Sequence, residues 1–174
     1  ATSKIRHTAD LETVRTMGFR GEALPSIAAV SRFQMVTRSA AEESGTQLRV
    51  EGGTLTNVRQ VGAPVGTEID VRSLFFNVPA RRKFLRTTGT ELTHCLETVT
   101  RVALMRPDVD FTVRHGDREL LRAPVGDLAR RAVDVLGADA RSLVPIDTAR
   151  GGVIVQGLAA RPGEGRTSAS GALY

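Results

Sequence analysis

The strongest constraint on the fold is one amphipathic stretch near the middle of the chain, residues 90–105. Its apolar side chains recur at positions i, i+3, i+4, i+7, i+10 and i+11, which places them in one stripe along a helix. The stripe consists of Leu92, Cys95, Leu96, Val99, Val102 and Ala103. A helix with such a stripe has to pack against another layer of secondary structure. We therefore predict a helix over residues 90–105, with Cys95 in the core and His94, off the stripe, at the surface.

On both sides of this helix the apolar residues alternate with polar ones, which is the period of a strand. Gly52-Gly53, His115-Gly116-Asp117 and Gly151-Gly152 lie between such segments and predict hairpin turns. The predicted strands are 32–38, 46–51, 54–61, 66–71, 109–114, 119–123, 142–148 and 152–160. Further helices are predicted over 8–17, 22–30, 80–86 and 127–136. The fold class is then α+β, with helices on one face of a mostly antiparallel or mixed sheet.

A glycine-flanked arginine precedes the second predicted helix. Gly18 and Gly21 bracket Arg20, and the helix-forming run begins at Glu22. Glycine lets the backbone approach a ligand closely, and the start of a helix offers unpaired N–H groups. Arg20 adds a permanently charged donor, so the segment is a candidate phosphate site, although a plain helix entry has the same pattern. It is not a Walker A loop, because no Gly-Lys-Ser/Thr follows it.

The charge of the chain is moderately basic, with a net charge of +5 and 22 arginines but only two lysines. The densest basic run holds Arg81, Arg82, Lys83 and Arg86. One reading is a solvated helix face with Phe84 and Leu85 turned inward, and the other is a contact with phosphate or DNA. A single cysteine excludes a disulfide within the chain, and no Cys/His spacing predicts a zinc site. No apolar run is long enough for a membrane span, so no membrane partner is expected.

Four blocks of the sequence, taken together, resemble the MutL family of DNA mismatch repair proteins, within the GHKL ATPase superfamily. They are residues 1–5 (ATSKI), 18–27 (GFRGEALPSI), 66–67 (GT) and 74–85 (LFFNVPARRKFL), in the order and at the spacing of that family. The two long blocks are specific, because gyrases, heat-shock chaperones and histidine kinases do not carry them in this form. The resemblance covers nearly the whole chain.

The resemblance implies a Bergerat-type ATP-binding fold, a layer of helices on a mixed, mostly antiparallel sheet. Residues 1–150 would be the C-terminal part of the ATP-binding domain, and residues 151–174 the first strands of a transducer domain. Several positions match ATP-binding residues of the family. They are Thr2, Ser3 and Lys4 of the lid over the nucleotide, Arg20, Gly21, Glu22, Ala23 and Leu24 around the triphosphate, and Thr67 toward the adenine.

The resemblance also implies what the chain does not contain. In this family the water-activating glutamate, the magnesium-binding asparagine and the Asp-x-Gly motif that recognises adenine lie before the lid segment. A lysine that reaches the γ-phosphate lies beyond the position of Tyr174. We therefore expect an excised piece with half of an ATP site, with no catalytic residue and no metal ligand of its own, and with exposed apolar faces. Glu22 is expected to cap its helix rather than to act as a general base.

The function implied is that of a mismatch repair ATPase. Such a protein binds and hydrolyses ATP with Mg²⁺ and closes a dimeric clamp. It relays mismatch recognition by MutS to downstream repair enzymes and binds DNA weakly, without sequence specificity. A bacterial cytoplasmic, nucleoid-associated location is expected. Two alternatives remain open: a non-catalytic basic DNA-binding module that uses Arg81, Arg82, Lys83 and Arg86, and another enzyme of the same superfamily, such as a topoisomerase subunit.

Overall fold

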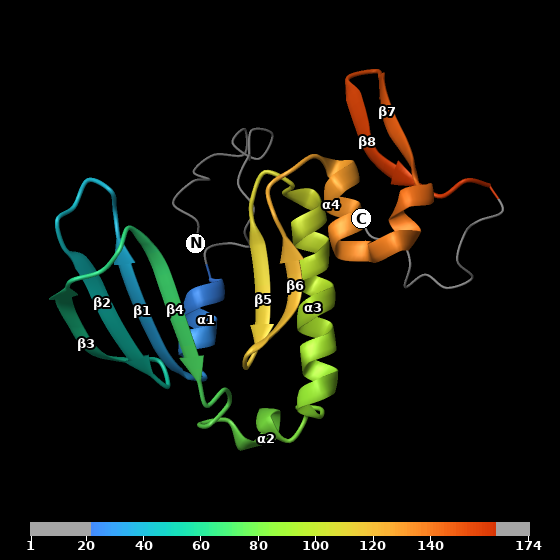
Figure 1. Ribbon diagram of the computed structural model, residues 1–174. Helices are drawn as coiled ribbons and strands as arrows, with labels where there is room; N and C mark the ends of the chain where they lie inside the picture. The colour runs from blue at the N-terminus through green and yellow to red at the C-terminus, as the bar shows by residue number, and fades with distance from the viewer. Residues whose placement is uncertain (1–21, 163–174) are drawn as a thin grey trace. The chain divides into compact units, whose positions relative to one another are not determined.

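The computed structural model describes residues 22–162, apart from the side chains of residues 138 and 139. The chain forms two compact units that divide between residues 85 and 86 (Figure 1). The first unit combines two short helices with a four-stranded sheet. The second combines two longer helices with two hairpins. The α+β fold class expected from the sequence is confirmed.

The sheet of the first unit is antiparallel throughout, in the order β3-β2-β1-β4. Its strands are β1 (Arg32–Arg38), β2 (Gly45–Glu51), β3 (Thr54–Val61) and β4 (Gly66–Arg72). The turn between β2 and β3 is formed by Gly52 and Gly53, which both have positive φ, as the glycine pair predicted. A bulge between Arg49 and Val50 shifts the β2–β3 register by one residue.

The two faces of this sheet differ in chemistry because the side chains alternate along each strand. On one face the register aligns Phe33 with Val50 and Val71, and Met35 with Leu48 and Ile69. On the other face it aligns charged and amide side chains, among them Arg32, Gln34 and Arg49. Only a part of the apolar face is covered within the unit: Phe33 is buried, whereas Ile69 and Val71 are exposed.

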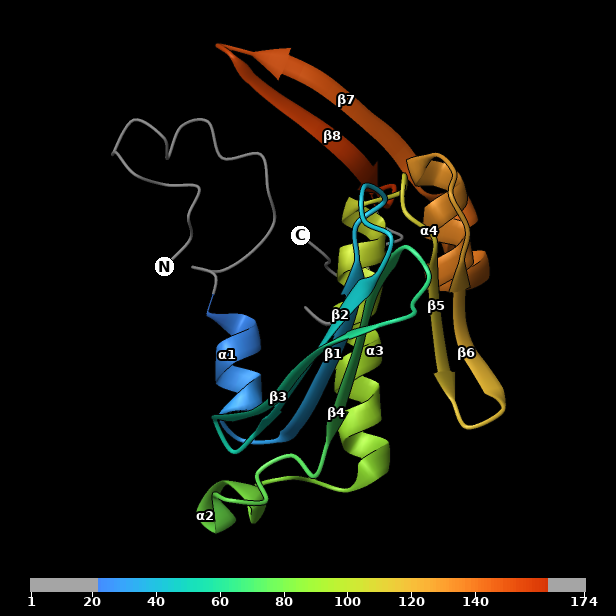
Figure 2. The ribbon, with the colours of Figure 1, turned by 90° about the vertical axis from the view of Figure 1, so that its left-hand side faces the viewer.

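Helix α1 (Ala23–Ala28) contacts β1 and is shorter than the predicted helix over 22–30 (Figures 1 and 2). The difference arises because backbone carbonyls at its C-terminal end accept hydrogen bonds from elsewhere in the unit. Gly53 N–H donates to the oxygen of Ala28 at 3.1 Å, and Phe75 N–H donates to that of Val30 at 2.6 Å. These bonds end the helix against the sheet.

The second unit begins with α3 (Thr88–Met105), the amphipathic helix that the sequence predicted. Thr87 caps its start by accepting a hydrogen bond from the amide of Thr90. The hairpin of β5 (Phe111–His115) and β6 (Arg118–Ala123) follows, then α4 (Leu128–Leu136), the 3-10 helix η2 (Gly137–Ser142) and the hairpin of β7 (Val144–Arg150) and β8 (Val153–Ala159). Asp127 caps the start of α4 by accepting a hydrogen bond from the amide of Arg130. The sequence did not predict the 3-10 helix η2.

The core of the second unit lies between the C-terminal end of α3, the β5–β6 hairpin and α4. Ala103, Leu121, Ala123 and Ala132 are buried there. The prediction that Cys95 is a core residue is wrong, because Cys95 is exposed. Among the described residues of this unit, α3 contacts α4. Only Ala103 of the helix is buried, and Leu92, Leu96 and Val99 of the stripe are half-buried. His94 is exposed, as predicted.

The domain boundary predicted between residues 150 and 151 falls in the turn that joins β7 to β8. These two strands pair along their whole length, from Val144 with Ala159 to Arg150 with Val153. The two compact units divide between residues 85 and 86. The boundary between residues 150 and 151 stays a prediction.

Candidate functional site

The start of α1 is the described part of the predicted phosphate site. Glu22 occupies the N-cap position, but its side chain forms no capping hydrogen bond, which corrects the capping role expected for it. Ala23 and Leu24, in the first turn, are exposed. Their amide groups have no hydrogen-bond partner within residues 22–162, because the first N–H groups of a helix lack intrahelical acceptors. Thr2, Ser3, Lys4, Arg20 and Gly21 lie outside the described residues.

The other end of α1 is fixed by two segments that are distant in sequence. Gly52 N–H, in the β2–β3 turn, donates to the carbonyl oxygen of Ser31 at 3.0 Å. The Asn77 amide, in the segment after β4, donates to the carbonyl oxygen of Ala29 at 3.0 Å. Asn77 belongs to the family-like block over residues 74–85, but its side chain was not singled out from the sequence. Nothing in the spacing of the chain indicates that an asparagine after β4 holds the end of a helix that precedes β1.

Thr67, expected on the adenine side of the nucleotide, lies near the start of β4. It is paired in register with Thr37 of β1, and the two hydroxyl oxygens are 2.8 Å apart. Thr67 is exposed. Its hydroxyl is thus held by a cross-strand hydrogen bond and remains accessible to a ligand.

The basic segment after β4 is accessible along its whole length. Helix α2 (Pro79–Arg82) is only four residues long, and Arg81, Arg82, Lys83 and Arg86 are all exposed. The reading in which Phe84 and Leu85 turn inward is wrong: Phe84 is 83% exposed and Leu85 is 41% exposed. Since α2 ends at Arg82, both residues follow the helix and do not lie on a packed face of it. Within residues 22–162, no ion pair joins any of the four basic side chains to a carboxylate.

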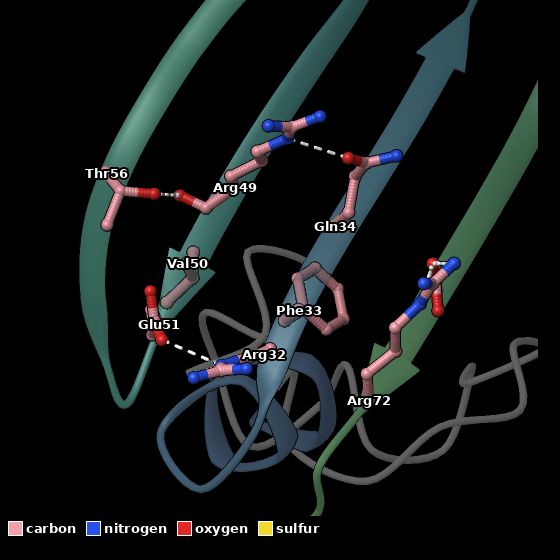
Figure 3. A pocket seen from close by; sticks show the side chains of 9 residues that line it. Arg32, Phe33, Gln34, Arg49, Val50, Glu51, Thr56 and Arg72 are labelled. Atoms are coloured by element: carbon pink, nitrogen blue, oxygen red, sulfur yellow. Dashed lines mark hydrogen bonds and ion pairs between the residues drawn. The ribbon is translucent and has the colours of Figure 1, made fainter.

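The polar face of the four-stranded sheet carries a shallow hollow (Figure 3). Arg32, Arg49 and Arg72 line it together with Glu51 and Asp70. Arg32 Nε donates to Glu51 at 2.8 Å, and Arg72 Nε donates to Asp70 at 2.7 Å. The bond with Asp70, followed by its charge, raises the pKa of the Arg72 guanidinium. The sequence indicated strands here. The pair of Arg32 with Glu51 follows from the β1–β2 register, which the sequence does not give, whereas Asp70 and Arg72 lie two residues apart on β4.

A buried arginine on α4 organises the second unit. The Arg131 side chain is fully buried, and its terminal nitrogens donate to five backbone carbonyl oxygens at 2.6–3.2 Å. These oxygens belong to Ala103, Arg106, Pro107, Val109 and Pro124. Arg131 thereby joins the end of α3 to the segments on either side of the β5–β6 hairpin. The sequence could have indicated that Arg131 is buried, because it stands three residues after Leu128, on the apolar side of the predicted helix.

The described residues contain neither a metal centre nor a membrane segment. Between residues 22 and 162, no group of three or more His, Cys, Asp or Glu side chains could hold a metal ion. No helix in the same range is long and apolar enough to cross a membrane. A hydrogen bond from Arg106 lowers the pKa of the Asp108 carboxyl group. That pair lies on the exposed surface just after α3.

Comparison with known proteins places the chain among mismatch repair proteins. It is 51% identical over 164 residues to the DNA mismatch repair protein MutL of Anaeromyxobacter sp. (strain K), covering 93% of this chain and 27% of that protein. It is 47% identical over 170 residues to MutL of Trichlorobacter lovleyi, covering 98% of this chain and 29% of the relative. No protein-family model matches the chain.

A solved structure gives the same result for the fold. The ATPase domain of Aquifex aeolicus MutL, complexed with ADP, superposes with a TM-score of 0.68 at 38% identity, covering 82% of this chain and 56% of that domain. The fold therefore places the chain in the class of GHKL ATP-binding proteins. Within this class the chain belongs, over the segment that it spans, to the MutL family of DNA mismatch repair proteins. It spans little more than a quarter of the length of those curated relatives, 27% in the first case.

Proposed function

We propose that this chain is part of a mismatch repair ATPase. In the whole protein, ATP binding and hydrolysis would close a dimeric clamp and relay mismatch recognition to downstream repair enzymes. The observation that carries the proposal is the 51% identity to MutL across 93% of the chain. The fold supports it, because it matches an ATPase domain whose structure contains ADP.

The chain's part in this function is to hold the nucleotide. Arg20, Gly21, Glu22, Ala23 and Leu24 would surround the triphosphate. The amides of Ala23 and Leu24, which have no hydrogen-bond partner within residues 22–162, would donate to phosphate oxygens. The hydrogen bonds from Gly53 and Asn77 to the end of α1 support this role, since they fix the helix that presents those amides. Thr2, Ser3 and Lys4 form the lid, and the hydroxyl of Thr67 lies toward the adenine.

No group of three or more His, Cys, Asp or Glu side chains among residues 22–162 could hold a metal ion. We assign no catalytic residue and no metal ligand to this chain, and both roles are left to other parts of the protein. When bound, the metal would offset charge on the phosphate oxygens. The partners of the whole protein are DNA, the mismatch-recognition protein MutS and a second copy of itself, in the bacterial cytoplasm near the nucleoid.

Calorimetric titration of the full-length protein with ATP, with and without magnesium, tests the nucleotide assignment. Arg20→Ala is expected to weaken ATP binding, because it removes a charged donor from the phosphates. Arg101→Ala removes an equal charge from the exposed side of α3 and is expected to leave the affinity unchanged. Unchanged affinity in Arg20→Ala would remove that residue from the site. A full-length protein that binds no ATP would overturn the ATPase assignment itself.

A second candidate function is DNA binding through the basic segment. The observation that favours it is the exposure of Arg81, Arg82, Lys83 and Arg86, with no carboxylate paired to them in the described structure. Phosphate contacts release counterions, so affinity falls with salt. A triple variant, Arg81→Gln with Arg82→Gln and Lys83→Gln, is expected to lower the slope of log affinity against log salt by about 3. An unchanged slope would exclude these residues from the DNA contact. ATP binding, measured on the same variant, is expected to stay the same.

A further inference from the structure

The polar face of the four-stranded sheet carries five arginines that belong neither to the proposed nucleotide site nor to the basic segment over residues 81–86. We call this surface the arginine face. It comprises Arg32 and Arg38 of β1, Arg49 of β2, Arg59 of β3 and Arg72 of β4. The alternation of side chains and the register place all five on one side of the sheet. Arg49 and Arg59 are exposed.

Four of these arginines are held in the same way, by a hydrogen bond from the inner nitrogen, Nε. Arg32 donates to Glu51, Arg72 to Asp70, Arg49 to Gln34 and Arg59 to Gln47, at 2.7–2.8 Å. For Arg49 and Arg59 this leaves both terminal nitrogens without a bond among residues 22–162. Figure 3 shows the terminal nitrogens of Arg49 extending beyond the bond to Gln34. The hydrogen bond at Nε therefore orients the guanidinium groups of Arg49 and Arg59 before any ligand binds.

The partner of each Nε determines how much charge the face presents. Arg32 and Arg72 bond to carboxylates, which offset their charge. Arg49 and Arg59 bond to neutral amides and keep a full positive charge. Arg49 pairs in register with Asn57, two residues from Arg59, so the two arginines are diagonal neighbours. Such neighbours lie about 7–8 Å apart in an antiparallel pair.

The chemistry of this pair fits a chain of phosphates. A guanidinium whose orientation is fixed and whose terminal donors are free matches phosphate geometry and loses little entropy on binding. Two such groups in diagonal register offer consecutive contacts to a repeating anion. The hollow itself is a poorer site, because Glu51 and Asp70 line it. We propose that the Arg49 and Arg59 side of the arginine face binds the phosphate backbone of DNA. The choice of DNA as the polyanion rests on the proposed function in mismatch repair.

The test is fluorescence anisotropy of a labelled DNA duplex with the full-length protein, without nucleotide, over a series of salt concentrations. The double variant Arg49→Gln with Arg59→Gln is expected to weaken binding several-fold and to lower the salt slope by about 2. The matched control, Arg101→Gln with Arg118→Gln, removes the same charge from exposed positions of the second unit. It is expected to keep the wild-type slope.

A second variant tests the anchoring without removing an arginine. Gln34→Glu would turn the Arg49 anchor into an ion pair like that of Arg32 with Glu51, and is expected to lower the salt slope by about 1. Wild-type affinity and slope in both variants would overturn the proposal, as would an equal loss in the Arg101/Arg118 control. ATP titration of the same proteins separates the two proposals, since it reports on the nucleotide site and not on this face.

Discussion

At the scale of single residues, Arg131 shows how a charge can serve structure alone. Burying a charge is costly unless it is fully hydrogen-bonded. The two terminal nitrogens of Arg131 meet this condition through carbonyl oxygens around the end of α3, where the helix leaves acceptors without intrahelical donors. The Nε of Arg131 has no hydrogen-bond partner within residues 22–162. Its ring contact with Phe111, 5.5 Å from guanidinium carbon to centroid, adds a cation–π interaction.

Removing this side chain should destabilise the protein severely. Arg131→Ala would leave five carbonyl oxygens in the second unit without their donor, so we expect a loss of at least about 3 kcal/mol. Arg131→Lys keeps the charge but not the planar fork, and an intermediate loss is expected. The midpoint of thermal unfolding measures both changes. Arg101→Ala on α3 is the control, and its effect should stay within about 0.5 kcal/mol. An Arg131→Ala variant as stable as this control would show that the carbonyl network is unimportant.

Also at the residue scale, the sequence predicted which residues lie on strands, but not which side chains bond to each other between strands. The alternation around Arg32 and Gln34 predicted a strand over residues 32–38, which the structure contains. It could not show that Gln34 orients Arg49, because that contact depends on which strands pair and in what register. The site residues Thr2, Ser3, Lys4, Arg20 and Gly21 stay predictions, since they lie outside the described part of the chain.

At the scale of elements, local signals predicted most of the secondary structure. The glycine pairs at residues 52–53 and 151–152 mark two of the hairpin turns, and the apolar stripe marks α3. The ends of α1 and α2 were less predictable. Helix α1 stops early because the carbonyls of Ala28, its last residue, and of Val30, just after it, accept hydrogen bonds from Gly53 and Phe75, which are far away in sequence. A periodic pattern carries no information on such contacts.

The two glycine pairs offer a matched test of turn strain against packing. Gly52 has φ +57° and Gly151 has φ +58°, so alanine at either position meets the same backbone penalty of about 1–2 kcal/mol. A Cβ on Gly52 would also lie 3.1 Å from the Asn77 amide and 3.3 Å from Phe76, whereas none would lie within 4 Å at Gly151. We therefore expect Gly52→Ala to lower the thermal midpoint more than Gly151→Ala. Equal shifts would mean that Asn77 and Phe76 make room for the added methyl group at no cost in stability.

At the scale of the whole molecule, apolar surface remains open on the four-stranded sheet. Leu55 and Val58 of β3 are 59% and 58% exposed, and the register places them opposite Val50 and Leu48 on the apolar face. Phe33, on the same face, is only 5% exposed. A contiguous apolar surface of this kind marks an interaction site or an aggregation risk. This agrees with the expectation, made from the sequence, that the chain exposes apolar faces.

This surface gives a prediction for the 174-residue chain on its own. It should bind a hydrophobic dye such as ANS while folded and unfold at a low temperature, because part of its apolar area stays in water. Leu55→Thr with Val58→Thr should reduce the dye fluorescence without lowering the thermal midpoint, since both side chains are already solvated. Phe33→Thr should lower the midpoint, because it removes a buried ring at a cost of several kcal/mol, about 3–5 for a change to alanine. High cooperative stability together with no dye binding would refute the exposed face, and would mean that the chain covers its own apolar surface.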